Sequence, residues 1–211
     1  MKNTIIIVFI TTLFTCKAQQ STVSLHNSAE AFGINGYYYK DFNNYLNVFE
    51  DTWVYTNGNT SLTTTLQKKA MVHVTTSDLS SDYYTDVVIG EYKFIENGIE
   101  KINTLQNLLN NYSDPYDYNM VMTSVSISSD INTCINCQPR DIYLRGSYSE
   151  PNCDRWMSPV LSMRYFVENG VEKILLYFNS GERFMTDMYG NPPPCNEYAL
   201  PFGEYILIKQ D

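Results

Sequence analysis

Histidine and basic side chains are scarce in this chain. Its 211 residues contain two histidines, His26 and His73, and 14 Lys and Arg against 23 Asp and Glu, which gives a net charge of −9. Two histidines are too few for a metal centre that uses several imidazoles. A serine or cysteine nucleophile needs a neighbouring base that a third group orients, and nothing around either histidine indicates such a triad. We therefore predict no metal site, no cofactor and no catalytic residues.

The acidic balance also excludes classes of partner. Nucleic acids and anionic lipid surfaces bind to basic patches on a protein. A chain with 14 basic and 23 acidic residues is not expected to form such a patch. A glycosidase-like pair of carboxylates is defined by distance and burial, which a sequence does not show. Glutamates that flank Asn-Gly turns, as in this chain, are typical of solvated hairpin ends. We expect a protein that is not an enzyme and that does not bind nucleic acid.

Long apolar runs are missing as well. Residues 4–14 are apolar but too short to cross a bilayer, which takes about twenty residues. With a basic start and a possible cut at Ala18-Gln19, residues 1–18 are typical of an export signal. Alternatively, Leu13-Phe14-Thr15-Cys16 resembles a lipobox, in which Cys16 would carry a lipid. Either route predicts an exported protein, periplasmic, secreted or an outer-membrane lipoprotein, with a membrane contact only through Cys16.

The few cysteines predict disulfides. Once Cys16 is cut off or lipidated, the remaining cysteines are even in number, which is typical of disulfides in an exported chain, with the pairing left open. Cys134-Ile135-Asn136-Cys137 has the C-x-x-C form of zinc and redox sites. A zinc ribbon would need a second such motif, and a redox centre would need a helix start, so we expect a structural role. The disulfide candidates are Cys134, Cys137, Cys153 and Cys195.

A nine-residue segment occurs twice, at 94–102 (FIENGIEKI) and at 166–174 (FVENGVEKI). Each copy places Asn-Gly between β-branched and aromatic residues, which is the strongest short-range signal for a β-hairpin. In the second copy a two-residue loop predicts a consistent apolar face. The pairs on that face are Tyr165 with Ile174, Met163 with Leu176, and Leu161 with Phe178.

The sequence of the first copy does not determine which of its faces is buried. There the same count brings Lys93 and Glu91 onto the equivalent face, so the alternation does not say which side is buried. All four mature cysteines lie in the second half of the chain, which argues against two equal units. We expect two equivalent hairpins within one sheet system.

The rest of the chain also predicts strands, because it is rich in Tyr, Phe, Thr, Val and Ile. One short helix is expected over residues 40–49, whose apolar side chains recur at helical spacing. Asn57-Gly58 predicts a hairpin that sets Trp53 opposite Leu62, and Lys68-Lys69 predicts a solvated stretch or a turn. We expect about ten strands in one antiparallel up-and-down barrel, with a β-sandwich as the alternative. This single β domain would span residues 37–211, after a polar arm or tether at 19–36.

Three stretches resemble a known family. They are the run of residues 38–60 (YYKDFNNYLNVFEDTWVYTNGNT), the Cys16-Lys17-Ala18-Gln19 ending, and the segment from Gly90 to Gly98 (GEYKFIENG). Together they are similar to a family of small exported proteins from Bacteroidota, an uncharacterised domain of unknown function. The resemblance covers most of the chain and implies no activity and no functional residues.

A looser resemblance concerns the fold. A short helix followed by Gly-x-Trp at the first strand is the opening of lipocalin-like (calycin) barrels, and here Asp51-Thr52-Trp53 stands at that place. Asp51 departs from the glycine of the pattern, and Lys209 would be the late basic residue that covers the tryptophan. The resemblance implies a lipocalin-like barrel in which Trp53 closes the barrel or is a core residue.

The expected function is binding. The leading hypothesis is a non-enzymatic exported or lipid-anchored β-barrel that binds a small apolar ligand or a cell-surface partner. The alternative is a structural or adhesion-type sandwich whose tyrosine-rich loops contact protein or glycan, since exposed aromatic rings stack on both. The tyrosines concerned are Tyr37, Tyr38, Tyr39, Tyr83, Tyr84, Tyr112, Tyr116 and Tyr118.

Overall fold

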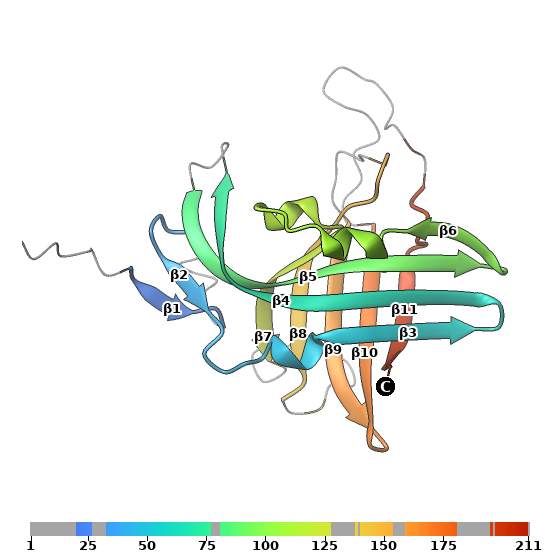
Figure 1. The fold of residues 1–211 in the computed structure, drawn as a ribbon. Helices are drawn as coiled ribbons and strands as arrows, with labels where there is room; N and C mark the ends of the chain where they lie inside the picture. Colours follow the sequence, from blue (N-terminus) through green and yellow to red (C-terminus); the bar gives the residue numbers. More distant parts are fainter. Residues whose placement is uncertain are drawn as a thin grey trace, which may run out of the picture.

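The computed structural model describes residues 20–26, 33–76, 81–127, 138, 140–153, 159–180, 195 and 197–210. The predicted export signal with Cys16 lies outside these residues, and so do Cys134 and Cys137. The described residues form eleven strands of one sheet and three short 3-10 helices (Figure 1).

Eight of the strands close into a barrel. Each pairs antiparallel with the next one along the chain, and the last returns to the first, with Ile208 opposite Val54 and Lys209 opposite Trp53. This closure confirms the predicted all-β, antiparallel up-and-down barrel and makes the sandwich alternative wrong. The barrel strands are β3 (Asp51–Asn57), β4 (Thr60–Thr76), β5 (Ser81–Glu96), β7 (Met120–Ile127), β8 (Ile142–Tyr148), β9 (Val160–Glu168), β10 (Val171–Asn179) and β11 (Gly203–Lys209).

Three further strands extend the sheet beside β5. On one edge of this long strand, β2 (Tyr38–Lys40) pairs first, then β7, and finally β6 (Ile99–Asn103). The strand β1 (Thr22–Ser24) adds to β2 in parallel, and it lies within the segment expected to be a polar arm. With 16 residues, β5 is longer than the barrel wall requires, and β2 and β6 pair with its two ends.

The expected helix over residues 40–49 shrinks to one 3-10 turn, η1 (Asn47–Phe49). Asn44 has a positive φ of 56°, which an α-helix does not allow. The carboxylate of Asp41 instead accepts hydrogen bonds from the backbone N–H groups of Tyr45 and Leu46, each at 2.9 Å. The segment is a compact loop held by Asp41.

Both predicted turns of the duplicated segment are present. The φ values are 52° and 79° at Asn97 and Gly98, and 53° and 76° at Asn169 and Gly170, as a type I′ turn requires. The second copy forms β9 and β10 with the predicted register, which is confirmed along all nine pairs. The first copy forms β5 and β6, which pair through a bulge.

Two details of the first hairpin differ from expectation. Its turn is Gly58-Asn59, one position later than predicted, so Trp53 lies opposite Thr64 and Leu62 opposite Tyr55. The shift in pairing is two residues, which keeps side chains on their expected face because the strand period is two.

Of the two alternatives expected at Lys68-Lys69, a solvated stretch or a turn, the turn is wrong. The strand β4 runs through it and bends at a bulge between Lys69 and Val72. Met71 has a φ of 53° in this bulge, where the extra residue breaks the regular alternation of side chains.

Candidate functional site

A cavity of about 250 Å³ lies on the outer wall of the barrel, and we call it the wall pocket. Its floor belongs to β4 and β5, and its roof is the connection between β6 and β7. Figure 1 shows this connection, with its 3-10 helices η2 (Leu105–Leu109) and η3 (Pro115–Asp117), lying along β5. The lining residues are Lys69, Ala70, Val72, His73, Ile89, Asn111, Tyr112, Ser113, Pro115 and Tyr118.

The β4 bulge shapes the floor. A carboxylate oxygen of the buried Asp86, on β5, accepts a hydrogen bond from the backbone N–H of Met71 at 2.9 Å. Asp86 also accepts from the hydroxyl of Tyr38 at 2.6 Å, so it fixes the bulge to the N-terminal strands. The bulge brings Lys69, on one side of it, and His73, on the other, to the same cavity.

The roof is held by its own side chains. Asp114 accepts a hydrogen bond from the backbone N–H of Tyr116 at 2.9 Å and so caps η3, with the buried Pro115 in the first turn. The hydroxyl of Tyr118 donates to the carbonyl oxygen of Asn110 at 2.7 Å. The rings of Tyr112 and Tyr118 meet edge to face at 4.9 Å, which makes one wall of the pocket rigid.

Apolar packing joins roof and floor. Tyr118 belongs to a small buried cluster with Val87, Ile89 and Val121, separate from the main core. Ile89 is fully buried at the base of the pocket, and Val72 packs against the same cluster. A bound molecule would therefore find an apolar floor, where Ala70 and Val72 keep some exposed surface, beside an aromatic wall.

Three polar side chains of the lining make no hydrogen bond or ion pair with the described residues: Lys69, Asn111 and Ser113. A lysine ammonium, an amide and a hydroxyl that are not used internally can bind a ligand without breaking native contacts. By contrast, the neighbouring Lys68 binds Asp41 at 2.9 Å and Asn47 at 2.7 Å. The polar groups of the wall pocket are available for recognition.

His73 also borders the pocket. Its Nε2 lies 2.6 Å from an oxygen of Asp82, and its ring stacks on Tyr84 with centroids 4.7 Å apart. Within the part of the chain that the structure describes, no hydrogen bond joins His73 to Ser113, the serine of the lining. The contact between nucleophile and base that a serine hydrolase uses is not formed in this lining.

Large apolar side chains are buried in the interior of the barrel. Trp53 is fully buried, its Nε1 donates to the carbonyl oxygen of Phe49 at 2.8 Å, and the ammonium of Lys209 lies 5.7 Å from its ring. Other large side chains of this core are Leu62, Leu66, Tyr92, Phe94, Met163, Leu176 and Phe178.

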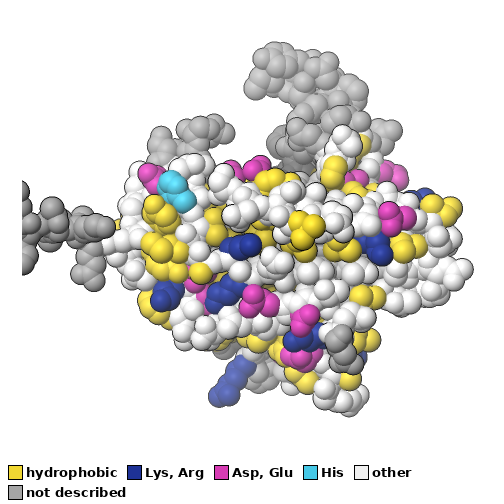
Figure 2. All heavy atoms as spheres, in the orientation of Figure 1, with side chains coloured by type: hydrophobic (Ala, Val, Ile, Leu, Met, Phe, Trp, Pro, Cys, Tyr) yellow, Lys and Arg dark blue, Asp and Glu magenta, His cyan; other side chains and the backbone are white. Residues whose placement is uncertain are grey.

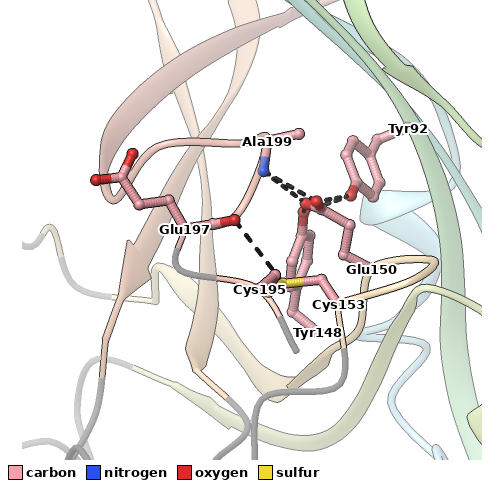
Figure 3. The surroundings of a disulfide bond; sticks show 7 residues. All are labelled: Tyr92, Tyr148, Glu150, Cys153, Cys195, Glu197 and Ala199. Carbon is pink, nitrogen blue, oxygen red and sulfur yellow. Dashed lines mark hydrogen bonds between the residues drawn. A yellow bond between two sulfur atoms is a disulfide. The ribbon is translucent and has the colours of Figure 1, made fainter. Parts of the chain in front are cut away.

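Cys153 and Cys195 form a disulfide at one end of the barrel, with their Cα atoms 5.2 Å apart (Figure 3). Beside it, the carboxylate of Glu150 accepts hydrogen bonds from the N–H of Ala199 at 2.9 Å and from the hydroxyl of Tyr148 at 3.0 Å. The disulfide and the bond from Ala199 attach the segment before β11 to the end of β8, and the bond from Tyr148 holds Glu150 in place. We call this group the end clamp, and its role is structural.

The tyrosines of the end clamp stay protonated. The hydroxyls of Tyr92 and Tyr148 are hydrogen-bonded to each other, and Tyr92 also lies 3.4 Å from Glu150 (Figure 3). Burial raises the pKa of both tyrosines far above the ordinary value, with the nearby carboxylate adding to the effect. They donate hydrogen bonds here and are not bases.

Glu91 is a buried carboxylate that the sequence pattern did not single out. It lies on the outer face of β5 under the β6–β7 connection, where one oxygen accepts from the N–H of Asn119 at 3.1 Å. The other oxygen has no hydrogen-bond partner. Burial raises the pKa of Glu91 above its usual range, although Thr104 and Asn119 oppose the shift.

Two further searches concern clusters of metal-ligand side chains and membrane-spanning helices in the described residues. Within the described ranges, no three side chains of His, Cys, Asp or Glu come together as metal ligands do. None of the helices in those ranges has the length and hydropathy of a membrane span. On the face that Figure 2 shows, basic side chains lie scattered among acidic ones.

The comparisons identify a family and nothing more specific. Searches of curated proteins and of solved structures found no match. A family profile, described as a family of unknown function, DUF6705, matches residues 1–210. Since this match covers nearly all of the sequence, the chain belongs to the DUF6705 family.

Proposed function

We propose that this protein is a non-enzymatic binding protein that holds a small molecule in the wall pocket. The observation that carries the proposal is a cavity of about 250 Å³ with an apolar floor and unused polar groups around it. At about 30 Å³ per water, this space would hold roughly eight waters. It would also accept one ring-sized compound, near the lower end of the volumes usual for ligand sites.

The large side chains buried in the barrel interior support this location over the barrel centre. In the predicted lipocalin-like arrangement an apolar ligand would enter the barrel, where the fully buried side chains of Trp53, Tyr92 and Phe178 now lie. Displacing side chains of this size would cost several kcal/mol each. The wall pocket needs no such rearrangement.

We also propose that the protein acts outside the cytoplasm. The export signal predicted over residues 1–18 supports this, and so does the disulfide between Cys153 and Cys195, because disulfides persist in oxidising compartments. The intact mass of the native protein tests the proposal. A chain that starts at Gln19, or a diacylated Cys16, supports export, and an uncut chain with free thiols contradicts it.

Filling the pocket tests the binding proposal. A fragment library screened by amide chemical shifts should give hits that perturb residues 69–73 and 111–118. In Ser113→Phe the new ring would occupy the cavity, so these hits should be lost. Ser149→Phe is the matched control, because Ser149 is an exposed serine outside the lining. Hits that persist in Ser113→Phe, or that map elsewhere, would contradict a function of the wall pocket.

A further inference from the structure

We infer that the ligand of the wall pocket is a small carboxylic acid with a flat apolar body, held by an ion pair with Lys69. This inference rests on the proposed function and adds the chemical class of the ligand. It follows from three observations: an unpaired cation, neighbouring carboxylates that are already occupied, and the spacing between the cation and the apolar floor.

Lys69 is a cation without an internal counter-ion. Lys101 pairs with Glu96 at 3.4 Å and Lys173 with Glu168 at 2.6 Å, whereas Lys69 pairs with no described residue. In a chain with a net charge of −9, an ammonium that pairs with no carboxylate of the described residues is available to an anion from outside.

The carboxylates near the bulge are each engaged elsewhere. Asp86 accepts from Met71 and Tyr38, Asp82 is bound to His73, and Asp114 caps η3. None of them makes an ion pair with Lys69. Their contacts hold the bulge and the roof in place, so the positive end of the pocket is preserved by the fold.

The spacing suits an acid with one ring. In the β4–β5 pairing Lys69 lies opposite Val87, and Ile89 lies one position further along the same face. Such diagonal neighbours are about 7–8 Å apart between backbones. A carboxylate on Lys69 would therefore place a ring over this part of the floor, between Val72 and the aromatic wall of Tyr112 and Tyr118. Asn111 and Ser113 could then bond the second carboxylate oxygen or a ring hydroxyl.

Charge-matched probes test the inference on the full mature chain with its disulfide intact. Benzoate and phenylacetate are the acidic probes, and benzamide and benzyl alcohol are neutral compounds of nearly the same shape. Amide chemical shifts give both the affinity and the location. The acids should bind at least about tenfold more tightly than the neutral compounds, and their affinity should fall with added salt.

Three variants distinguish the effect of the Lys69 charge on binding from an effect on folding. Lys69→Met removes the charge but keeps an unbranched stem, and it should weaken benzoate at least about tenfold. Lys69→Arg should bind within a few-fold of the parent. Lys93→Met is the matched control, because Lys93 is a half-buried lysine of the same sheet outside the lining, and it should change nothing. Melting temperatures of all three establish that each variant is folded.

Each outcome is informative. Equal binding of acids and neutral compounds in the pocket, or an unchanged affinity in Lys69→Met, would overturn the inference and leave the binding function intact. Probes of both kinds that fail to perturb residues 69–73 and 111–118 would overturn the proposed function itself. Loss of benzoate binding in Lys69→Met together with its retention in Lys69→Arg would support the inference.

Discussion

The two copies of the duplicated segment have the same turn and opposite orientations. Phe94, in the first copy, is 2% exposed and belongs to the main core. Phe166 holds the same place in the second copy, yet it is half-buried on the outside of the barrel, with its ring 4.9 Å from the guanidinium of Arg164. Nearly identical local sequence therefore determines the turn and leaves the buried face undecided.

A bulge accounts for the inversion. In the first copy Lys101 is an extra residue, so Ile102 lies opposite Phe94 and both apolar side chains share a face. In the second copy the ladder is regular, with Phe166 opposite Lys173 and Tyr165 opposite Ile174. The flanking residues choose between these arrangements, because Lys93 in the first copy replaces Tyr165 of the second.

The residues after each copy decide its place in the fold. The second copy continues as Leu175-Leu176-Tyr177-Phe178 and becomes a full barrel strand. The first continues with Asn103 and Thr104, where β6 ends and the connection over β5 begins. The expectation of two equivalent hairpins is therefore wrong: one is a pair of barrel strands, and the other adds a short edge strand that leads into the roof of the wall pocket.

Deleting one lysine from each copy should produce the largest difference in unfolding free energy between the two copies. Removal of Lys173 shifts β10 by one residue, which turns Ile174, Leu176 and Phe178 to the outer face. We expect a loss of about 5 kcal/mol or more, enough to unfold a typical domain. Removal of Lys101 only closes the bulge, so its effect should stay within about 1 kcal/mol. Circular dichroism and denaturant unfolding would measure both, and a stable Lys173 deletion would contradict this account.

Truncating Phe94 and Phe166 should show that the first side chain is buried in the core and the second lies on the outside. Phe94→Ala leaves a cavity in the core and should cost about 3–5 kcal/mol of unfolding free energy. Phe166→Ala should cost about 1 kcal/mol, because it removes a partly exposed contact with Arg164. Urea unfolding of the two variants side by side provides the measurement. Equal losses would mean that the two faces are not inverted.

Glu91 offers a pH-dependent test of the same inversion, since the equivalent position of the second copy is the core residue Met163. Burial raises the pKa of Glu91 above its unfolded value, so its contribution to stability is full below the unfolded pKa of about 4.3. That contribution is lost as pH rises through the folded pKa. Glu91→Gln cannot ionise and should gain about 1 kcal/mol over the parent at pH 8 and little at pH 4.

Melting temperatures across this pH range would check the sign for Glu91. Glu100→Gln, in the same copy but exposed, should show no such trend. A gain for Glu91→Gln that is larger at pH 4 than at pH 8 would contradict burial of an ionisable carboxylate.

The two turn glycines should give the smallest effect and the same one in both copies. Gly98 and Gly170 have φ of 79° and 76°, and a Cβ added at either meets nothing within 4 Å. Gly98→Ala and Gly170→Ala should each cost about 1–2 kcal/mol from backbone strain alone. Denaturation midpoints would measure this, and a clear difference between the two variants would show that tertiary context affects the turns as well.

The wall pocket was less predictable than the barrel. Alternating apolar residues and Asn-Gly turns indicated the strands, because these signals depend on neighbours in sequence. The pocket combines a β4 bulge, where Lys68-Lys69 predicted a solvated stretch or a turn, with a connection of which only the tyrosines were singled out. Its parts are about forty residues apart in sequence, so their meeting depends on the β4–β5 pairing and on the packing of Tyr118 against Ile89.

The sequence by itself determined the all-β class, the Asn-Gly turns and the register of the second hairpin, since each depends on local backbone preference and a period of two. Tertiary structure decided barrel closure through β11 and β3, the pairing of Cys153 with Cys195, and the inward or outward facing of each copy. These depend on which distant surfaces bury one another. The same nine residues can therefore end in the core or on the wall, according to the residues that surround them.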